Sequence, residues 1–205
     1  MIGVVDYGIG NIKAFLNRFE RLGVKAQRVS DIPSIKTCNR LILPGVGHFS
    51  QAMTKLKASN FIPTLEKMII NDGTPLLGVC VGMQMLSDYS EEGNAKGLGW
   101  IPGEVRHMRN VRNYELLRLP HMGWNGINIK KHDPLFTNIL NQSNQFYFLH
   151  SFHFKPEKNE HILATSFYGF EFASIISNGN VYGMQCHPEK SHEWGTNILQ
   201  NFSRL

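Results

Sequence analysis

The first half of the chain alternates short apolar runs with stretches in which apolar residues recur at helical spacing. The apolar runs have the length of buried strands. They lie at residues 2–6, 24–29, 40–43 and 76–79. Helical spacing occurs at Phe15, Phe19 and Leu22 after the first run, and at Phe61, Leu65, Met68 and Ile69 before the fourth. Strands that alternate with helices predict an α/β fold whose central sheet is mostly parallel and flanked by helices.

The second half has a different pattern, in which short apolar and aromatic segments follow one another closely. Such spacing is typical of antiparallel hairpins. The predicted segments are 103–108, 125–130, 145–149, 162–167, 172–177 and 181–186. A final helix is expected from about residue 194, with Trp194, Ile198, Leu199 and Phe202 on its inner face. No repeat or linker divides the chain, so we expect one domain over residues 1–205 with an additional antiparallel β portion.

Composition narrows the class of protein. A chain of 205 residues with 42% hydrophobic content can bury one sizeable core. No run approaches the roughly 18 apolar residues that a membrane span requires. Cys38, Cys80 and Cys186 lie far apart and form no Cys-x-x-Cys pair, which indicates neither a disulfide framework nor a zinc ribbon. These features predict a protein of the reducing cytoplasm that does not associate with membranes.

The formal net charge of +5 is the feature that suggests an anionic partner. Much of the positive charge is concentrated in Arg106, Arg109, Arg112 and Arg118. No helix-turn-helix, zinc-finger or RNP pattern accompanies these residues, so we expect no nucleic-acid binding. An anionic small molecule or an acidic face on a protein partner fits the charge better.

The candidate chemistry centres on Cys80, which stands in the pattern Gly78-Val79-Cys80-Val81-Gly82 after the fourth apolar run. A strand, a reactive residue between glycines and a helix form a nucleophile elbow, here with Cys in place of Ser. The glycines allow a sharp turn, and a helix N-terminus favours the thiolate. An ordinary buried cysteine is the alternative interpretation, since cysteine is among the most buried residue types.

A cysteine nucleophile needs a base and a third group that orients the base. His187 and Glu189 follow the last predicted strand, where open α/β sheets place their sites. Pro188 is expected to keep the backbone between them extended, with both side chains on one side. A hydrogen-bonded loop histidine beside a solvated acid is the alternative. Other histidines near predicted loops are His48, His121, His150 and His153. No carboxylate or cysteine spacing around them indicates a metal site.

The segment Pro44-Gly45-Val46-Gly47 follows the third apolar run and is the candidate oxyanion site. Two glycines tolerate positive φ, so backbone N–H groups in this turn can point toward Cys80 or away from it. An N–H group that a partner has to turn inward would leave the isolated chain a poor catalyst. A plain turn is the alternative, because glycine and proline are frequent in turns of every kind.

Together these motifs resemble the class I glutamine amidotransferases, which use a Cys-His-Glu triad. The segments that carry the resemblance are 44–47, 78–84 and 187–191. Three further segments, 6–11, 120–125 and 147–152, look like those of glutaminase subunits that serve a separate cyclase. The resemblance covers the chain from end to end and implies a single class I glutamine amidotransferase domain.

The resemblance implies that the chain hydrolyses glutamine to glutamate and ammonia without a cofactor. Cys80 would form a γ-glutamyl thioester, His187 would act as base and then as acid, and Glu189 would orient His187. The ammonia would pass to a (β/α)₈ cyclase subunit, which forms a heterodimer with the glutaminase and makes imidazole glycerol phosphate and AICAR in histidine biosynthesis. Free ammonia has to stay unprotonated and away from water, so a dedicated partner is chemically sensible.

The remaining roles implied by the resemblance fall on three groups of residues. The backbone at Val46 and Gly47, with the N–H of Val81, would form the oxyanion hole. The positions that match substrate-binding residues are Gln84, Glu92, Ser151 and Phe152. The positions that match the face of the cyclase subunit are Trp124, Tyr147 and Lys190.

Some positions depart from the family pattern. Ala14 stands where Ser is common, Phe152 where Tyr is frequent, and His192 where a small residue is usual. None of them belongs to the triad. They leave open a paralogue that supplies ammonia for surface-sugar amidination, because one site can serve different pathways. A stand-alone cysteine hydrolase is a further alternative, and glutamate release with and without a cyclase would separate it from the first.

Overall fold

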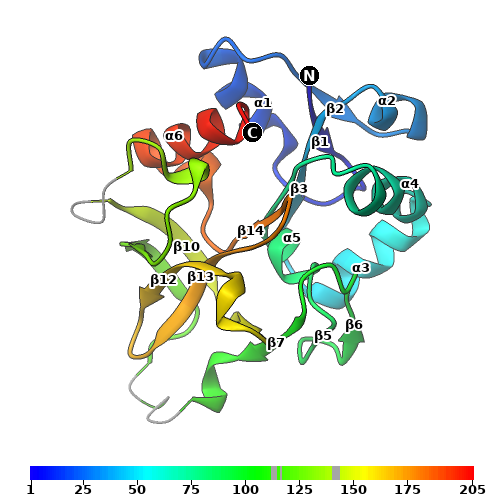
Figure 1. Ribbon diagram of the computed structural model, residues 1–205. Coiled ribbons are helices and arrows are strands. Elements are labelled where there is room, and N and C mark those ends of the chain that lie inside the picture. The colour runs from blue at the N-terminus through cyan, green and yellow to red at the C-terminus, as the bar shows by residue number, and fades with distance from the viewer. Residues whose placement is uncertain (112–114, 116, 140–143) are drawn as a thin grey trace.

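The central feature of the computed structural model is a mixed β-sheet with helices on both sides (Figure 1). The structure describes residues 1–111, 115, 117–139 and 144–205. Within these residues the sheet has eight strands, in the order β2 (Ala26–Val29), β1 (Ile2–Val5), β3 (Arg40–Gly45), β4 (Leu76–Cys80), β14 (Val181–Met184), β13 (Glu171–Asn178), β12 (Ile162–Phe167) and β9 (Asn128–Ile129). From β2 to β14 neighbouring strands are parallel, and from β14 to β9 they are antiparallel. The predicted α/β fold class is confirmed.

Helices cover both faces of the parallel strands. They are α1 (Ile12–Arg21), α2 (Ile32–Lys36), α3 (Phe49–Ala58), α4 (Ile62–Glu66) with a π-helical turn over Lys67–Asn71, α5 (Val81–Gln84) and α6 (His192–Phe202). Figure 1 shows α1 and α6 on one side of the strands and α3 and α4 on the other. Each helix turns an apolar face to the sheet, as Phe15 and Phe19 of α1 do. This burial is the main source of helix stability.

The additional antiparallel portion predicted from the sequence is divided between the main sheet, where it forms β13, β12 and β9, and two smaller sheets. One pairs β8 (His121–Asn125) with β10 (Phe146–His150). The other has the order β11 (Phe152–Pro156), β7 (Gly103–His107), β5 (Tyr89–Ser90) and β6 (Ala95–Lys96). Strands β10 and β11 are separated by Ser151 alone, so this residue joins the two small sheets. The turn between them faces the carboxyl end of β4, as the site below shows.

Several elements differ from the sequence-based expectations. Helices α2 and α3 and strands β8 and β11 were not predicted, and the segment expected at 125–130 forms only β9. The final helix begins at residue 192 rather than 194. The helix after Cys80 is a single turn, because the chain leaves the helical conformation after Gln84. Of the basic residues considered above, Arg112 lies outside the described residues. No described helix combines the length and apolar character needed to cross a bilayer.

Strand register brings three candidate segments to one edge of the sheet. Gly45 at the end of β3 lies opposite Cys80 at the end of β4. Met184 at the end of β14 lies opposite Val79, so the residues that follow β14 emerge beside Cys80. Parallel strands end at the same edge, and ligands of open α/β sheets bind there. The sheet thus places the nucleophile candidate between the oxyanion candidate and the base candidate.

Candidate active site

Cys80 sits at the junction of β4 and α5 in a strained backbone conformation. Its φ and ψ are 55° and −114°, a region that costs a non-glycine residue free energy and that clusters at functional sites. The thiol is only 4% exposed. Its Sγ donates to the carbonyl of Leu149 at 3.9 Å, and Gln185 Nε2 donates to Sγ at the same distance. The surrounding structure therefore stabilises an unfavourable backbone conformation at Cys80, which places its sulfur at the junction of β4 and α5.

The glycines around Cys80 serve a purpose different from the expected one. Cys80 itself takes the positive φ, whereas Gly78 and Gly82 do not. A Cβ on Gly82 would lie 1.9 Å from the carbonyl oxygen of Leu43, and one on Gly78 would lie 2.6 Å from the carbonyl oxygen of Gly82. Gly82 is thus required for the close approach of the elbow to β3, and Gly78 for the close approach of β4 to the first turn of α5.

His187 and Glu189 form the predicted pair. His187 Nδ1 lies 2.9 Å from Glu189 Oε1, and both side chains are buried. The extended backbone expected at Pro188 is not found, because Pro188–Lys190 forms a 3₁₀ turn. The turn brings the carboxylate back toward the imidazole ring. Since Glu189 can only accept from Nδ1–H, it leaves Nε2 as the nitrogen free to act on the sulfur.

Backbone contacts fix the His187 turn against β10. The N–H of His187 donates to the carbonyl of Tyr147 at 2.9 Å. Ser191 Oγ donates to the carbonyl of His187 at 2.6 Å and accepts from the N–H of Tyr147 at 3.0 Å. Arg18 Nε of α1 donates to the carbonyl of Glu189 at 3.2 Å. The base is held by its main chain from both sides of the turn.

The protonation of His187 is set by opposing effects. Burial lowers the pKa of His187, but hydrogen bonds to Cys80 and Glu189 outweigh burial and raise this pKa to about 10. The imidazole is therefore protonated at neutral pH. The charged ring is thus available as a proton donor next to Cys80.

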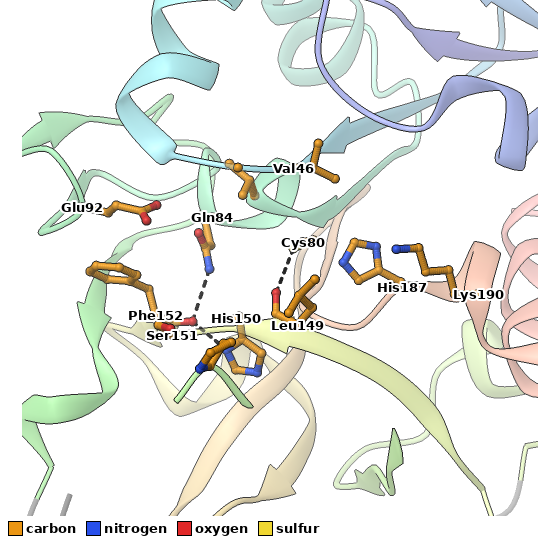
Figure 2. Close-up of a pocket in the computed structure, with 13 residues that line it drawn as sticks. Val46, Cys80, Gln84, Glu92, Leu149, His150, Ser151, Phe152, His187 and Lys190 are labelled. Carbon is orange, nitrogen blue, oxygen red and sulfur yellow. Dashed lines mark hydrogen bonds between the residues drawn. The ribbon is translucent and has the colours of Figure 1, made fainter. Parts of the chain in front are cut away.

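A cavity of about 280 Å³ opens over Cys80 (Figure 2). Its volume is below the roughly 300–1,000 Å³ of sites for drug-sized ligands and suits a single amino acid. Figure 2 shows Glu92 and Phe152 toward one end of the cavity and His187 toward the other, with Gln84 and Cys80 between them. The lining residues are Val46, Gly47, Cys80, Val81, Gln84, Glu92, Pro120, Leu149, His150, Ser151, Phe152, His187 and Lys190.

The structure thus gathers all the predicted substrate-binding and oxyanion residues on one cavity. In the oxyanion segment only Gly47 has a positive φ, of 84°, and Gly45 instead allows close contact with the backbone of Gly82. Tyr7 OH donates to the carbonyl of Pro44 at 2.8 Å and ties the end of β3. Among the hydrogen bonds of the described residues outside helices and strands, none starts from the N–H of Val46.

Two of the substrate-binding candidates are also bound by the protein. Gln84 Nε2 donates to Gln185 Oε1 at 3.0 Å and to the carbonyl of Phe152 at 3.3 Å, which leaves Gln84 Oε1 to face the cavity. Glu92 Oε2 accepts from the N–H of Phe49 at 2.8 Å, at the first residue of α3. Glu92 thus holds the helix that follows the oxyanion segment. These two side chains therefore have structural contacts whatever they bind in the cavity.

The three candidates for the partner's face lie together beside the cavity. Lys190 Nζ lies 5.4 Å above the ring centre of Tyr147, and the ring of Trp124 makes an edge contact with Tyr147 at 5.9 Å. Trp124 also stacks on His192 at 4.8 Å. Trp124 is 47% exposed, so it presents a large apolar surface to solvent. Such exposure is typical of a contact surface.

Sequence reasoning did not identify Gln185 or the roles of Leu149 and His150. Gln185 is fully buried and its amide points at Cys80, because Gln84 occupies its oxygen. Its position two residues before His187 was the one feature of the sequence that could have indicated a place in the site. Leu149 was placed in the strand predicted at 145–149 and His150 near a loop, and nothing in the sequence pairs this segment with Cys80. Among the described residues, no three His, Cys, Asp or Glu side chains are placed to hold a metal ion.

An α/β fold with a cysteine elbow, a His-Glu pair and an adjacent oxyanion loop defines a class of enzyme, the triad glutamine amidotransferases. The family model for class-I glutamine amidotransferases matches residues 3–204, and the chain belongs to this family. A crystal structure described as a glutamine amidotransferase has the same fold, with a TM-score of 0.74, 17% identity and coverage of 100% of this chain and 99% of the other.

Curated relatives narrow the family. The chain is 45% identical over its whole length to the imidazole glycerol phosphate synthase subunit HisH of Bdellovibrio bacteriovorus, and 43% identical to that of Leptospira borgpetersenii. Both comparisons cover 100% of each chain. Within the class-I glutamine amidotransferases, this chain is therefore a member of the HisH family, and the resemblance inferred from the sequence motifs is confirmed.

Proposed function

We propose that this chain hydrolyses glutamine with Cys80 as nucleophile and passes the ammonia to a (β/α)₈ cyclase subunit of imidazole glycerol phosphate synthase. The observation that carries the proposal is the convergence of Cys80 and His187, with Glu189 hydrogen-bonded to His187, on a cavity the size of an amino acid. The full-length relatives named as HisH subunits support the particular pathway. The free, buried cysteines support a reducing, cytoplasmic location.

The first chemical step follows from the geometry. The Cys80 thiolate attacks the carboxamide carbon of glutamine, and the C=O π electrons move to oxygen. The imidazolium of His187 then protonates the departing nitrogen, the C–N bond breaks, and ammonia and a γ-glutamyl thioester remain. Glu189 holds the Nδ1–H of His187, so that Nε2 faces the reacting atoms. Water, deprotonated by His187, then attacks the thioester and releases glutamate and the thiolate.

Charge that develops on the carboxamide oxygen needs nearby donors. Val81, Val46 and Gly47 line the cavity together with Cys80, and their N–H groups are the proposed donors. One such donor contributes roughly a hundredfold to a thousandfold in rate. The far end of the cavity offers Glu92 for an ammonium group and the main chain of Ser151 and Phe152 for the rest of the amino acid. This division matches the two polar ends of glutamine.

The partner would cover the mouth of the cavity. Several large apolar side chains there are exposed: Val46 42%, Met122 65%, Trp124 47% and Leu149 38%. Val46 and Leu149 also line the cavity, so a subunit seated on them would exclude water from the path of the ammonia. Exclusion keeps ammonia from diffusing away or being protonated. The exposed residues support a protein partner rather than a free-standing hydrolase.

The test is glutamate release by the full chain, alone and with a (β/α)₈ cyclase and its nucleotide substrate. Cys80→Ala should abolish glutamine-dependent turnover and leave turnover with ammonium salts intact, because the chemistry of the cyclase is untouched. Cys38→Ala is the matched control and should behave like the wild type, since Cys38 precedes β3 at the amino ends of the parallel strands, opposite the end that carries Cys80, and does not line the cavity. A glutamine-analogue electrophile that labels Cys38 or Cys186 instead of Cys80 would contradict the assignment.

A second pair of variants tests the base. His187→Asn should lower kcat by roughly a hundredfold to ten-thousandfold. Glu189→Gln should lower it less, because an orienting group contributes less than the base itself. Equal glutamate release by the chain alone, by the chain with the cyclase, and by the chain with the cyclase and its nucleotide substrate would favour a stand-alone hydrolase. Turnover with a sugar acceptor but not with the cyclase would favour the paralogous amidotransferase.

A further inference from the structure

A line of hydrogen bonds runs from the partner-facing strand β8 into the wall of the cavity. Asn125 Nδ2 lies 3.3 Å from His121 Nε2, and His121 Nδ1 lies 2.9 Å from His150 Nε2. His150 Nδ1 in turn lies 2.7 Å from the carbonyl oxygen of Phe152. Both imidazole rings are buried. The end of this line is visible in Figure 2, where a dashed line joins His150 to Phe152.

The chemistry of the end group fixes the direction of every bond in the line. A carbonyl oxygen can only accept, so His150 Nδ1 has to carry the proton. A neutral His150 then accepts at Nε2, which requires the proton of His121 to be on Nδ1. His121 accepts at Nε2 from the amide of Asn125, whose other hydrogen goes to the carbonyl of Phe167 at 2.9 Å. The two histidines are thus restricted to one tautomer each.

Burial keeps both rings neutral, which the line requires. Burial lowers the pKa of His121 to about 4 and that of His150 to about 3. The ring of His121 is also held in plane, because it stacks on Tyr168 at 4.0 Å and on Phe148 at 4.8 Å. Neither histidine can therefore rotate or change its proton without breaking a buried contact.

The acceptor at the end of the line belongs to the part of the cavity that faces the amino acid. The Phe152 carbonyl also accepts from Gln84 Nε2 at 3.3 Å, so two side chains clamp it. Ser151 and Phe152 both line the cavity; Ser151 is the single residue between β10 and β11, and Phe152 is the first residue of β11. The Ser151 carbonyl accepts from the N–H of Met108 at 2.9 Å, whereas the Phe152 carbonyl accepts from the side chains of His150 and Gln84. The position of the Phe152 carbonyl depends on these side-chain contacts.

We propose that His121 and His150 are positioning residues for the reaction. The two neutral, hydrogen-bonded rings, called the relay below, fix the Ser151–Phe152 main chain where it binds the amino acid. The activity test of this proposal depends on the proposed glutaminase function. The arrangement of the protons does not, so the two can fail separately.

The proton arrangement is tested by ¹⁵N NMR of histidine-labelled full-length chain. Signals are assigned by comparison with the single variants below. Both rings should be neutral with the proton on Nδ1, and their shifts should stay constant between about pH 6 and 8, where an ordinary histidine titrates. A proton on Nε2 of either ring, or titration within that range, would overturn the relay whatever the chain catalyses.

The kinetic test uses two substitutions of His150 that each keep one half of its contacts. The amide of His150→Asn occupies the place of Nδ1 and can still donate to the Phe152 carbonyl. The amide of His150→Gln reaches the place of Nε2 and keeps the contact with His121 only. In the complex with the cyclase, His150→Gln should raise the KM for glutamine about tenfold or more with kcat nearly unchanged, and His150→Asn should raise KM less than threefold.

His121 provides the matched pair one step further from the cavity. His121→Phe keeps the stacking on Tyr168 but leaves His150 Nε2 without a donor, whereas His121→Asn keeps a donor at the Nδ1 position. His121→Phe should therefore raise KM more than His121→Asn. Thermal unfolding of all four variants checks that each is folded. Equal KM values for the two folded variants of each pair would contradict the relay. If the wild-type chain itself releases no glutamate in the complex, that result would count against the proposed function and not against the relay.

Discussion

The two halves of the active site are held in place by different means. On the side of the parallel strands, backbone packing sets the geometry: Gly82 lies against Leu43, and Cys80 accepts a strained φ of 55°. On the side of the antiparallel portion, side chains set it, because His150 and Gln84 clamp the carbonyl of Phe152. The position of Cys80 therefore depends on glycines, whose lack of a Cβ allows close backbone contact. The position of the Phe152 carbonyl depends on side-chain hydrogen bonds.

This difference has a consequence for tolerance to mutation. A close backbone contact cannot be replaced by another side chain, because any Cβ forces the strands apart. A side-chain hydrogen bond can be replaced by an isosteric donor. We therefore expect the parallel side to tolerate few substitutions, and the antiparallel side to tolerate those that keep the hydrogen-bond donors in place.

The largest expected effect comes from Gly82→Ala. The new Cβ would lie 1.9 Å from the Leu43 carbonyl oxygen, so the elbow has to move and the unfolding free energy should fall by about 3 kcal/mol or more. Glutamate release should fall by at least a hundredfold, since the nucleophile moves with the elbow. Denaturant unfolding and steady-state kinetics measure the two quantities.

The matched control for this change is Gly126→Ala on the antiparallel side. Its Cβ would lie 3.4 Å from the Asn144 carbonyl oxygen, close to ordinary contact, and its φ is not in the left-handed region. The free energy of unfolding of the Gly126→Ala variant should therefore differ from that of the wild type by less than about 1 kcal/mol. A Gly126→Ala variant as damaged as Gly82→Ala would remove the distinction between the two sides.

An intermediate effect is expected at Glu92, which belongs to both sides. Glu92→Gln keeps an oxygen that can accept from the N–H of Phe49, but it loses the charge that attracts the ammonium group of the substrate. It should raise the KM for glutamine about tenfold or more and leave kcat and thermal stability near the wild type. Glu92→Ala should in addition lower stability by about 1 kcal/mol and lower kcat, because α3 loses its N-terminal cap next to the oxyanion segment. Identical kinetics and stability for the two variants would show that Glu92 does not hold α3.

The smallest effects concern pH, where the two sides should respond in opposite directions. The pKa of His187 is raised from 6.5 to about 10, so its stabilising contribution is complete below pH 6.5 and is lost as pH rises toward 10. The pKa of His121 and that of His150 are lowered to about 4 and about 3, so their contributions are complete above pH 6.5 and are lost as pH falls toward 4.

Unfolding free energies of the wild type and two variants across this range measure the pH effects. His187→Asn should be less sensitive than the wild type above pH 7, and His121→Phe less sensitive below pH 6. His153 shares the acid response, since burial also lowers its pKa to about 4, and it will leave a remaining slope. A His187→Asn chain with the alkaline slope of the wild type would contradict the charged state of the base.

The sequence predicted the parallel half of the fold well, because buried parallel strands are continuous apolar runs. The antiparallel half was predicted less well. Strand β8 contains Met122 and Trp124, which are apolar but exposed, so the inside-outside alternation that identifies a strand is lost. Helix α3 was missed although Phe49, Ala52, Met53 and Leu56 recur at helical spacing, because the segment was considered only as the end of a turn.

The candidate site divides along the same line. Cys80, His187 and Glu189 stand in motifs with fixed spacing and were found from the sequence, and the structure brings them together. The relay of His121 and His150 spans 29 residues with no local pattern, so only the register of β8 and β10 shows that the two rings meet. The φ of Cys80 and the 3₁₀ turn at Pro188 are likewise consequences of tertiary packing.

The pairing of β4 with β14 also determines when the site can form during synthesis of the chain. The two strands are neighbours in the sheet, yet Cys80 and Gln185 are 105 residues apart in sequence. At a synthesis rate of about 5–20 residues per second, the nucleophile leaves the ribosome roughly 5 to 20 seconds before its base. During that interval β4 is an open edge and the thiol has no proton acceptor. A chain whose synthesis stops before β14 is therefore inactive toward glutamine and prone to aggregate through that edge.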